Sequence, residues 1–531
     1  MKTLQHFKQS IYIGLILSII GLSGACSNID EGYNSIPSNF YPVEVKESTG
    51  VKLIGMGVEL DPHFFSQNLT RTQDGSKAED WDIVKERVRK MGVQNFRVMV
   101  QPHWWEPLND NSDSNVADMN KFTFDSQEMQ SLYKVLELAQ ENNVEVTLVL
   151  WGCPVNMDLI AGTPTGKHFL CDSRPNAPWV CGTDKYEEFA ENFSVLVKYL
   201  IETKGFTCVK AITPFNEPDS HTPNYGRTMW QGESDSYPDQ YAPMAKVLDA
   251  KFKSMGIRDK VQFNLSDNTD GSPSYLKACA DALQTEANLF NTHTYKFGYT
   301  TSNADMVNWE ENNVAMSNGK EHFIGEFGSN LTSGSSRQLD IDTYERGVLM
   351  TRIVINLLNG RAAGISYWSL IDQYYNRNGS YSEMQQLGLW KYVKKAYESD
   401  PTVFNTMKEN YEVRPQYYAY GLLTRFIKKN AEIFPLNLNE DLVAGTAVLN
   451  ENNKWVYIFA NNSTHNKPVE IINNKDQANG KYAVYKYIEG NLPVGDDLIQ
   501  SSEDVEVKGK ASLTIPRNSV CLLYTSPSPR D

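Results

Sequence analysis

Between residues 50 and 430 the chain alternates short apolar runs with longer amphipathic stretches. The short runs are rich in β-branched residues, which is typical of buried strands. The longer stretches repeat their apolar residues at helical spacing, most clearly over residues 184–204, 341–358 and 413–427. We therefore expect eight strands, at residues 51–58, 95–100, 144–151, 209–215, 261–265, 289–293, 322–326 and 364–369.

Eight strands that are each followed by a helix predict an α/β fold, a (β/α)8 TIM barrel over residues 50–430. In such a barrel the active site lies at the C-terminal ends of the strands. A doubly wound open sheet is the alternative, but no Gly-x-Gly-x-x-Gly motif follows the first strand to support it.

After residue 430 the pattern changes to strands alone. Apolar runs at 442–449 and 455–460 flank a polar turn, and further runs follow at 482–488, 511–515 and 520–524. Residues 431–524 are therefore expected to form a small all-β sandwich domain. The last stretch, 525–531, reads Thr-Ser-Pro-Ser-Pro-Arg-Asp, has no apolar pattern and resembles foreign sequence, so we expect a disordered, non-native tail.

The first 26 residues resemble the signal peptide of a bacterial lipoprotein. Basic residues precede an apolar run at 11–22, which is too short to span a bilayer, and Ser23-Gly24-Ala25 lead into Cys26. Because the usual Leu stands one place early, at Leu22, an ordinary secretory signal remains the alternative. We expect lipidation of Cys26, a polar linker over 27–49, and an exported lipoprotein of the outer membrane or cell surface of a Gram-negative, Bacteroidetes-like bacterium.

Charge and cysteine content exclude several classes of function. The chain has 50 Lys and Arg against 65 Asp and Glu, a net charge of −15, which disfavours a nucleic-acid partner. Cys171 and Cys181 are candidates for a short disulfide in an oxidising compartment, whereas Cys208 and Cys279 lie in apolar runs and are expected to be buried thiols. The sequence has no CxxC or HExxH motif, so we expect no metal. We also expect no cofactor and a monomer.

Two carboxylates stand at strand ends. The segment Ile-Thr-Pro-Phe-Asn-Glu-Pro places Glu217 after the fourth expected strand, and His-Phe-Ile-Gly-Glu-Phe-Gly places Glu326 at the end of the seventh. A buried carboxylate is costly unless it is paired or used. Two carboxylates at one barrel mouth suit glycoside hydrolysis, in which one protonates the leaving oxygen and the other attacks or activates water. Each motif alone is weak, but together they point to this chemistry.

With these motifs, residues 50–430 resemble a clan A retaining glycoside hydrolase, closest in motif to family 5, with families 30 and 39 as alternatives. The resemblance implies that Glu217 is the acid/base and Glu326 the nucleophile. It also implies supporting roles for residues that match the family's other motifs, namely Arg97 and Tyr295 beside the nucleophile, His293 in the His-x-Tyr motif, Asn216 at the sugar 2-hydroxyl and Trp368 at the floor of the sugar site.

The third strand departs from the family 5 pattern. Trp151 stands where many members carry a His, and His103 in the preceding loop is a candidate to replace it. Trp104, Trp105 and Trp230 suit either the core or stacking on sugar rings. A last group of acidic residues near strand ends are candidates to bind hydroxyls, namely Glu59, Glu106 and Asp267.

The sequence thus predicts a retaining β-glycosidase that hydrolyses a β-linked polysaccharide or oligosaccharide, with the glycan as partner and membrane contact only through the lipid anchor. The alternative from another class is a surface glycan-binding lipoprotein that keeps the barrel without turnover. Neither the sugar nor the choice between endo and exo action follows from the sequence, because loop lengths around the cleft decide both.

Overall fold

The structure is a computed structural model of the 531-residue chain. It describes residues 40–62, 78–106, 110–111, 113, 115–150, 186–219, 241–331, 338–374, 384–391, 411–438, 440–475 and 478–525. Cys26, Trp151, Cys171, Cys181 and Trp230 lie outside these residues, as does the side chain of His103.

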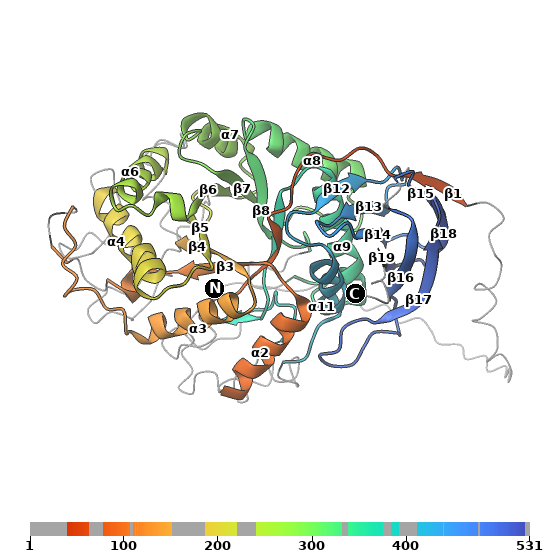
Figure 1. Ribbon diagram of the computed structural model, residues 1–531, viewed down its shortest axis with the longest axis horizontal. Helices are drawn as coiled ribbons and strands as arrows, with labels where there is room; N and C mark the ends of the chain where they lie inside the picture. The colour runs from red at the N-terminus through yellow and green to blue at the C-terminus, as the bar shows by residue number, and fades with distance from the viewer. Residues whose placement is uncertain are drawn as a thin grey trace, which may run out of the picture. The chain divides into compact units, whose positions relative to one another are not determined.

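Eight parallel strands close into a barrel in chain order (Figure 1). They are β2 (Gly55–Glu59), β3 (Asn95–Val100), β4 (Glu145–Leu150), β5 (Val209–Thr213), β6 (Gln262–Asn268), β7 (Leu289–Thr294), β8 (Glu321–Phe327) and β9 (Gly364–Tyr367). All eight lie where the apolar runs predicted them, so the barrel prediction is confirmed.

One α-helix of the described chain follows each barrel strand in sequence. In order these are α2 (Ala78–Met91), α3 (Gln127–Glu141), α4 (Tyr186–Lys198), α6 (Tyr241–Ser254), α7 (Pro273–Ala282), α8 (Asn303–Met316), α9 (Tyr344–Asn359) and α11 (Pro415–Phe426). Shorter pieces are the 3-10 turns η2 (Pro102–Trp104) and η6 (Arg258–Lys260), the π-turn η4 (Tyr199–Thr203) and the two-residue strands β10 (Gln373–Tyr374) and β11 (Met384–Gln385).

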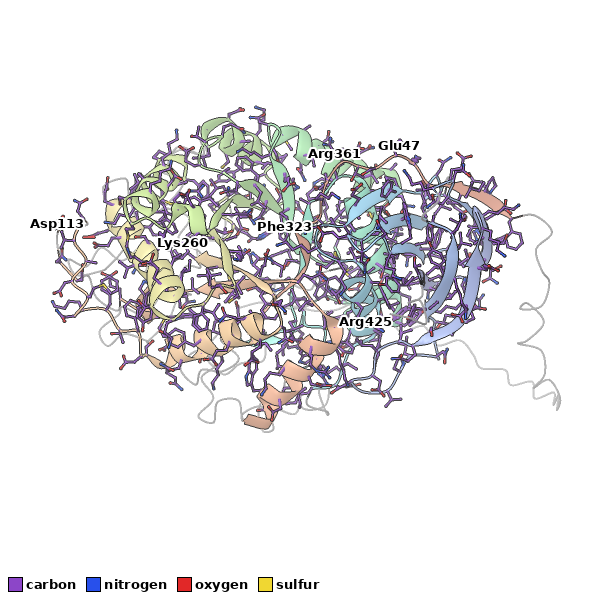
Figure 2. All side chains as sticks on the ribbon, viewed as in Figure 1. Glu47, Asp113, Lys260, Phe323, Arg361 and Arg425 are labelled. Atoms are coloured by element: carbon purple, nitrogen blue, oxygen red, sulfur yellow. The ribbon has the colours of Figure 1, made fainter. Side chains whose placement is uncertain are left out.

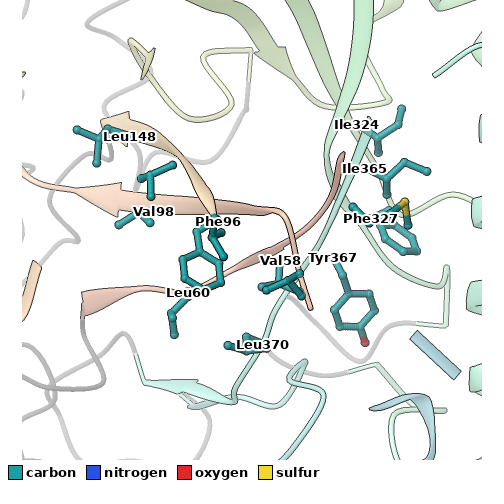
Figure 3. Packing of buried hydrophobic residues seen from close by; sticks show 14 of the residues in the cluster. Val58, Leu60, Phe96, Val98, Leu148, Ile324, Phe327, Ile365, Tyr367 and Leu370 are labelled. Carbon is teal, nitrogen blue, oxygen red and sulfur yellow. The ribbon is translucent and has the colours of Figure 1, made fainter. Parts of the chain in front are cut away.

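The strands alternate apolar side chains outside the barrel with polar ones inside. Phe96 and Val98 of β3 belong to the large hydrophobic cluster that also contains residues of the surrounding helices, whereas Arg97 between them makes polar contacts within the barrel. Figure 3 shows part of this cluster, with Val58 and Ile365 from neighbouring strands β2 and β9. The apolar layer between strands and helices fixes the barrel, and the polar interior is left for chemistry.

The C-terminal part consists of two sheets, as predicted for a β-sandwich. The larger has the strand order β12-β13-β14-β19-β16-β17 and the smaller β1-β15-β18. Their bounds are β1 (Tyr41–Glu44), β12 (Glu432–Pro435), β13 (Val443–Leu449), β14 (Trp455–Asn461), β15 (Lys467–Ile472), β16 (Gly480–Tyr487), β17 (Ser501–Val507), β18 (Lys510–Ile515) and β19 (Ser519–Thr525).

The central strand β14 of the six-stranded sheet is apolar on both faces. On β14, Trp455, Tyr457 and Phe459 join the cluster between the two sheets, while Val456 and Ile458 join the cluster of the barrel. Helices α9 and α11 contact the barrel-facing side. Arg425 of α11, labelled in Figure 2, stacks over the Tyr485 ring of β16 and donates to the Ile499 carbonyl. The sheet therefore shares its core with the barrel.

Two predicted boundaries need correction. The linker expected over 27–49 contains a strand, because β1 pairs in parallel with β15 and Val43 is fully buried between the sheets. The tail expected from residue 525 starts too early, because Thr525 is the last residue of β19 and its hydroxyl bonds the Trp455 backbone. Among the described residues no helix is long and apolar enough to cross a membrane.

Three cysteines are described, and all three are buried free thiols: Cys208, Cys279 and Cys521. The expectation for Cys208 and Cys279 is confirmed. Burial raises the pKa of the Cys208 thiol to about 11, so it stays protonated and unreactive near neutral pH.

The shared core gives a first prediction. Val456→Ala, at a fully buried site between barrel and sheet, should lower the free energy of unfolding by about 1.5–3 kcal/mol, from lost burial and the cavity left behind. Val494→Ala is the matched control, because Val494 is 89% exposed and should change stability little. Chemical denaturation of the three proteins measures both, and equal stability of the two variants would contradict the shared core.

Candidate active site

The candidate catalytic side chains come together at the C-terminal ends of the barrel strands. Glu217 follows β5, the fourth barrel strand, and Glu326 lies near the end of β8, the seventh. Arg97 comes from β3, and His293 and Tyr295 come from the end of β7. One oxygen of Glu217, one oxygen of Glu326 and a ring nitrogen of His293 all lie within 4.8 Å of one another.

Arg97 is the centre of the hydrogen-bond network. Its Nη1 donates to Glu326 Oε1 at 2.8 Å and to Glu59 Oε2 at 3.2 Å. Its Nη2 donates to Asn216 Oδ1 and Asp267 Oδ2, each at 2.7 Å. The guanidinium is 2% exposed, and the surrounding carboxylates hold its pKa above the ordinary value for arginine against the opposing effect of burial. Arg97 therefore remains a fixed positive charge beside Glu326.

Glu326 is held by donors on both of its oxygens. Arg97 bonds Oε1, and the Tyr295 hydroxyl donates to Oε2 at 2.8 Å. Burial raises the pKa of Glu326 above that of an ordinary glutamate, while the positive charges of His293 and Arg97 act in the opposite direction. The two bonds fix the direction in which the carboxylate points, and the cations favour the ionised form that an attacking group needs.

His293 joins Glu217 to a second carboxylate. Its Nδ1 lies 2.9 Å from Glu217 Oε1 and its Nε2 lies 3.1 Å from Asp267 Oδ1. Asp267 is an acceptor, and so is Glu217 when it is ionised; in that state the ring can donate on both sides only as the imidazolium. Burial lowers the pKa of His293, but the charges of Glu326 and Asp267 outweigh it and raise the pKa to about 10. Glu217 is 22% exposed and is the more open of the two glutamates.

A β-bulge in β6 places Asp267. Ser266 and Asn268 pair with consecutive residues of β7, so Asp267 between them is an extra residue. Ser266 and Asp267 have positive φ angles of 77° and 51°. The bulge points the Asp267 carboxylate at Arg97 and His293, and the Asp267 carbonyl accepts the Glu217 amide proton at 3.1 Å. Because of these charges the pKa of Asp267 lies well below its ordinary value, despite burial.

A second bulge, in β8, makes room for the same histidine. Residues 292 and 293 of β7 pair with Ile324 and Glu326, so Gly325 is the extra residue. A Cβ at Gly325 would lie 2.5 Å from Asn291 Oδ1 and 3.0 Å from His293 Nε2. Only glycine leaves space for these side chains, and Asn291 in turn donates to Asp267 Oδ1 at 2.6 Å.

The remaining predicted site residues divide into two groups. Asn216 lies in the network, and because its oxygen accepts from Arg97, its amide nitrogen is the group that can donate to a ligand. Trp368 directly follows β9 and is 5% exposed, in a small apolar cluster against which Tyr295 packs.

Glu106, in contrast, bonds Asn192 and the Asp110 amide, and burial raises its pKa to about 9. Trp104 and Trp105 are buried core residues. The backbone of His103 lies in η2, and Trp151 is outside the described residues.

Sequence reasoning gave Glu59 and Asp267 only as candidates to bind hydroxyls. In the structure they are buried partners of Arg97. A sequence signal existed only for position, since both residues lie near the ends of barrel strands. The bulge that directs Asp267 leaves no pattern in a single sequence.

Glu217, His293 and Glu326 are also spaced closely enough to bind a metal ion. The site already contains positive charge, however, because Arg97 donates to the Glu326 oxygen and the raised pKa of His293 favours its imidazolium form. A further cation would be repelled there. The described groups at this position therefore suit an ion-paired pair of carboxylates rather than a metal centre.

No protein-family model matches the chain, and no curated protein matches it. Solved structures share its fold. The catalytic domain of family 30 xylanase C from Talaromyces cellulolyticus is 14% identical, covers 92% of this chain and 100% of its own, and gives a TM-score of 0.61. An endo-β-1,6-glucanase is 15% identical, with 93% and 95% covered and a TM-score of 0.58.

A third similar structure is a conserved exported protein from Bacteroides fragilis, 13% identical, with 91% of this chain and 100% of that chain covered and a TM-score of 0.60. The resemblance to clan A glycoside hydrolases is thus confirmed at the level of the fold, with family 30 among the neighbours. At these identities the similarity establishes the architecture, and the activity has to be argued from the site.

The charge arrangement around His293 gives a second prediction. Asp267→Asn removes one of the two charges that keep the ring protonated, so the pKa of His293 should fall from about 10. Ring-nitrogen NMR measures the titration directly and needs no substrate. Asp281→Asn is the control, since Asp281 is an exposed side chain on another part of the barrel and should leave the pKa unchanged. An unchanged His293 pKa in the Asp267→Asn variant would contradict the proposal that the ring is an imidazolium.

Proposed function

We propose that this protein is a retaining β-glycosidase that hydrolyses a β-linked glycan. The observation that carries the proposal is the short separation of the two glutamates, whose oxygens lie within 4.8 Å of each other across the barrel mouth. Retaining enzymes hold their carboxyl groups about 5–5.5 Å apart, and inverting enzymes about 6.5–9.5 Å apart to admit a water. The short separation favours direct attack by a carboxylate.

The two glutamates differ in environment as the two roles require. Glu326 is buried and accepts hydrogen bonds from the Arg97 guanidinium and the Tyr295 hydroxyl, which suits a nucleophile that attacks as the anion. Glu217 is more exposed and makes a bond to His293, which suits a group that reaches the leaving oxygen. We therefore assign the nucleophile to Glu326 and the acid/base to Glu217.

In the first step the Glu217 carboxylic acid gives its proton to the glycosidic oxygen, and Glu326 forms a bond to the anomeric carbon as the leaving sugar departs. In the second step Glu217, now a carboxylate, removes a proton from water, and the water oxygen displaces Glu326. Arg97 and Tyr295 orient Glu326 and stabilise it as it leaves. The Asn216 amide is placed to donate to the sugar 2-hydroxyl, a contact that strengthens in the transition state.

The non-catalytic alternative is not favoured. A surface glycan binder needs a groove but has no use for a buried, ion-paired carboxylate opposite a partly exposed one. The named neighbours include a xylanase and a β-1,6-glucanase, which supports a β-linked polysaccharide or oligosaccharide as substrate without naming the sugar.

For location we propose export and anchoring by a lipid on Cys26. The N-terminal motif supports this, as does the exported neighbour from Bacteroides fragilis. Two lipid chains would be needed to hold the protein stably on a membrane. Cys26→Ala should therefore move the protein from the membrane fraction to the soluble exported fraction of an expressing cell, and an unchanged distribution would contradict the anchor.

Covalent trapping tests the nucleophile. A 2-deoxy-2-fluoro glycoside with an activated leaving group should form a stable adduct, because fluorine slows the second step more than the activated first step. Screening β-xylosides, β-glucosides, β-mannosides and β-galactosides identifies the sugar that reacts, and peptide mapping should place it on Glu326. The natural product should be released first in the β configuration.

Glu217→Ala is the matched variant for this experiment. It should still form the adduct with activated aryl glycosides, since these need little protonation, and azide should restore release. On natural substrates the rate of Glu217→Ala should fall by about 10²–10⁴-fold relative to wild type. An adduct on Glu59 or Glu106, or a first product of α configuration, would contradict the assignment. Absence of turnover on every glycan would favour the binder.

A further inference from the structure

A third glutamate of the site has no role in the reaction as described. Glu59 is the last residue of β2 and pairs in register with Arg97 of β3. It is 1% exposed, and its Oε2 accepts from Arg97 Nη1 at 3.2 Å, the same nitrogen that bonds Glu326. Glu59 is therefore the group with which the nucleophile shares Arg97 Nη1.

The position of Glu59 is firmly fixed by the backbone. Its carbonyl accepts from the Leu370 amide at 2.9 Å, after the last barrel strand, and the next residue donates to the Arg97 carbonyl at 3.1 Å. Asp61, two residues on, is 2% exposed and accepts from the Met99 amide at 2.9 Å. Both carboxyl groups are buried, and Asp61 is close enough to raise the pKa of Glu59, so the two groups are neighbours in the core.

The surroundings of the second carboxyl oxygen of Glu59 favour a protonated side chain. Oε1 is buried and finds no hydrogen-bond donor among the described residues. The neighbouring Asp61 carboxylate is also an acceptor, so two anionic groups would face each other without a proton between them. A proton on Glu59 converts this contact into an O–H···O bond to Asp61 and satisfies the buried oxygen.

The charge of the whole cluster points the same way. Two cationic groups, Arg97 and His293, lie in a cluster with five carboxyl groups, namely Glu59, Asp61, Glu217, Asp267 and Glu326. Even with Glu217 protonated as the acid, the other four carboxyl groups would outnumber the two cations if all were ionised. A buried excess of negative charge is costly, and a proton on the buried carboxyl whose second oxygen has no donor among the described residues reduces it. In agreement, burial and the charge of Asp61 raise the pKa of Glu59 well above its ordinary value, although Arg97 acts against them.

We propose that Glu59 is a neutral carboxylic acid and a positioning residue for the nucleophile: its carbonyl oxygen accepts from Arg97 and its O–H donates to Asp61. As a neutral acceptor it orients the guanidinium without competing with Glu326 for the positive charge. An ionised Glu59 would also orient the guanidinium, but it would compete with Glu326 for the positive charge. Glu326 would then be harder to keep ionised. The positioning role rests on the proposed function, whereas the protonation state does not.

Glutamine tests the protonation state because it reproduces the neutral acid, with one oxygen to accept from Arg97 and one N–H to donate to Asp61. Folding raises the pKa of Glu59, so its contribution to stability is present at low pH and is lost as pH rises from the ordinary glutamate value toward the folded value. The glutamine in Glu59→Gln does not titrate, so its contribution to stability does not change over this pH range. The thermal midpoint of this variant should therefore rise relative to wild type as the pH increases above the ordinary glutamate pKa of about 4.3.

Glu311→Gln is the control for the pH series, because Glu311 is exposed on α8, and its difference from wild type should not change with pH in this way. If the thermal midpoint of Glu59→Gln minus that of wild type stays flat or falls as the pH rises, Glu59 is ionised and the proposal is overturned. This measurement needs no substrate, so its outcome is independent of whether turnover is found.

Activity tests the positioning role. Glu59→Ala leaves Arg97 without one of its four acceptors and should lower kcat/KM by about 10–10²-fold, the effect of a small displacement at a catalytic group. Glu59→Gln should restore most of this loss. The acidic limb of its pH profile should also stay where it is in wild type, because the charge beside Glu326 is unchanged. An acidic limb displaced by a unit or more, or equal losses in both variants, would overturn the role.

Discussion

The site depends on one buried cation. The Arg97 guanidinium reaches four acceptors on four different parts of the barrel, and each of them is a group that would be costly to bury alone. The planar fork with five donors is what allows one side chain to do this; a lysine would provide a point charge without the fixed directions. Removing the charge would leave several carboxylates uncompensated, so the arrangement of the others follows from Arg97.

A second layer turns this charge into geometry. The Asp267 carboxylate holds both cations, and its backbone carbonyl holds the amide of Glu217, so one residue links the acid/base to the cation of the nucleophile. Asp267 can do so only because a bulge turns it toward the barrel interior, and Gly325 opens the opposite strand for the histidine. The two irregular strands on either side of His293 are therefore part of the site.

The sequence predicted the elements that repeat. Apolar runs located all eight barrel strands, and strand-end position identified Glu217 and Glu326 as a pair. It failed where tertiary contacts override the local pattern. The β17 segment is almost wholly polar and is a strand only because β16 offers it an edge, and β1 is a short piece that pairs with a strand more than 400 residues away. The protonation of Glu59 depends on Asp61 and Arg97 in space, which no single-sequence pattern records.

The six-stranded sheet has a consequence for how the chain can be divided. Its barrel-facing side belongs to the same hydrophobic cluster as the barrel helices, so a cut near residue 430 would open apolar surface on both products. Accessory domains joined by flexible linkers can be exchanged between enzymes, since each buries its own core. Here the β-domain acts as the outer wall of the catalytic barrel, and we expect it to be inherited, expressed and engineered only together with the barrel.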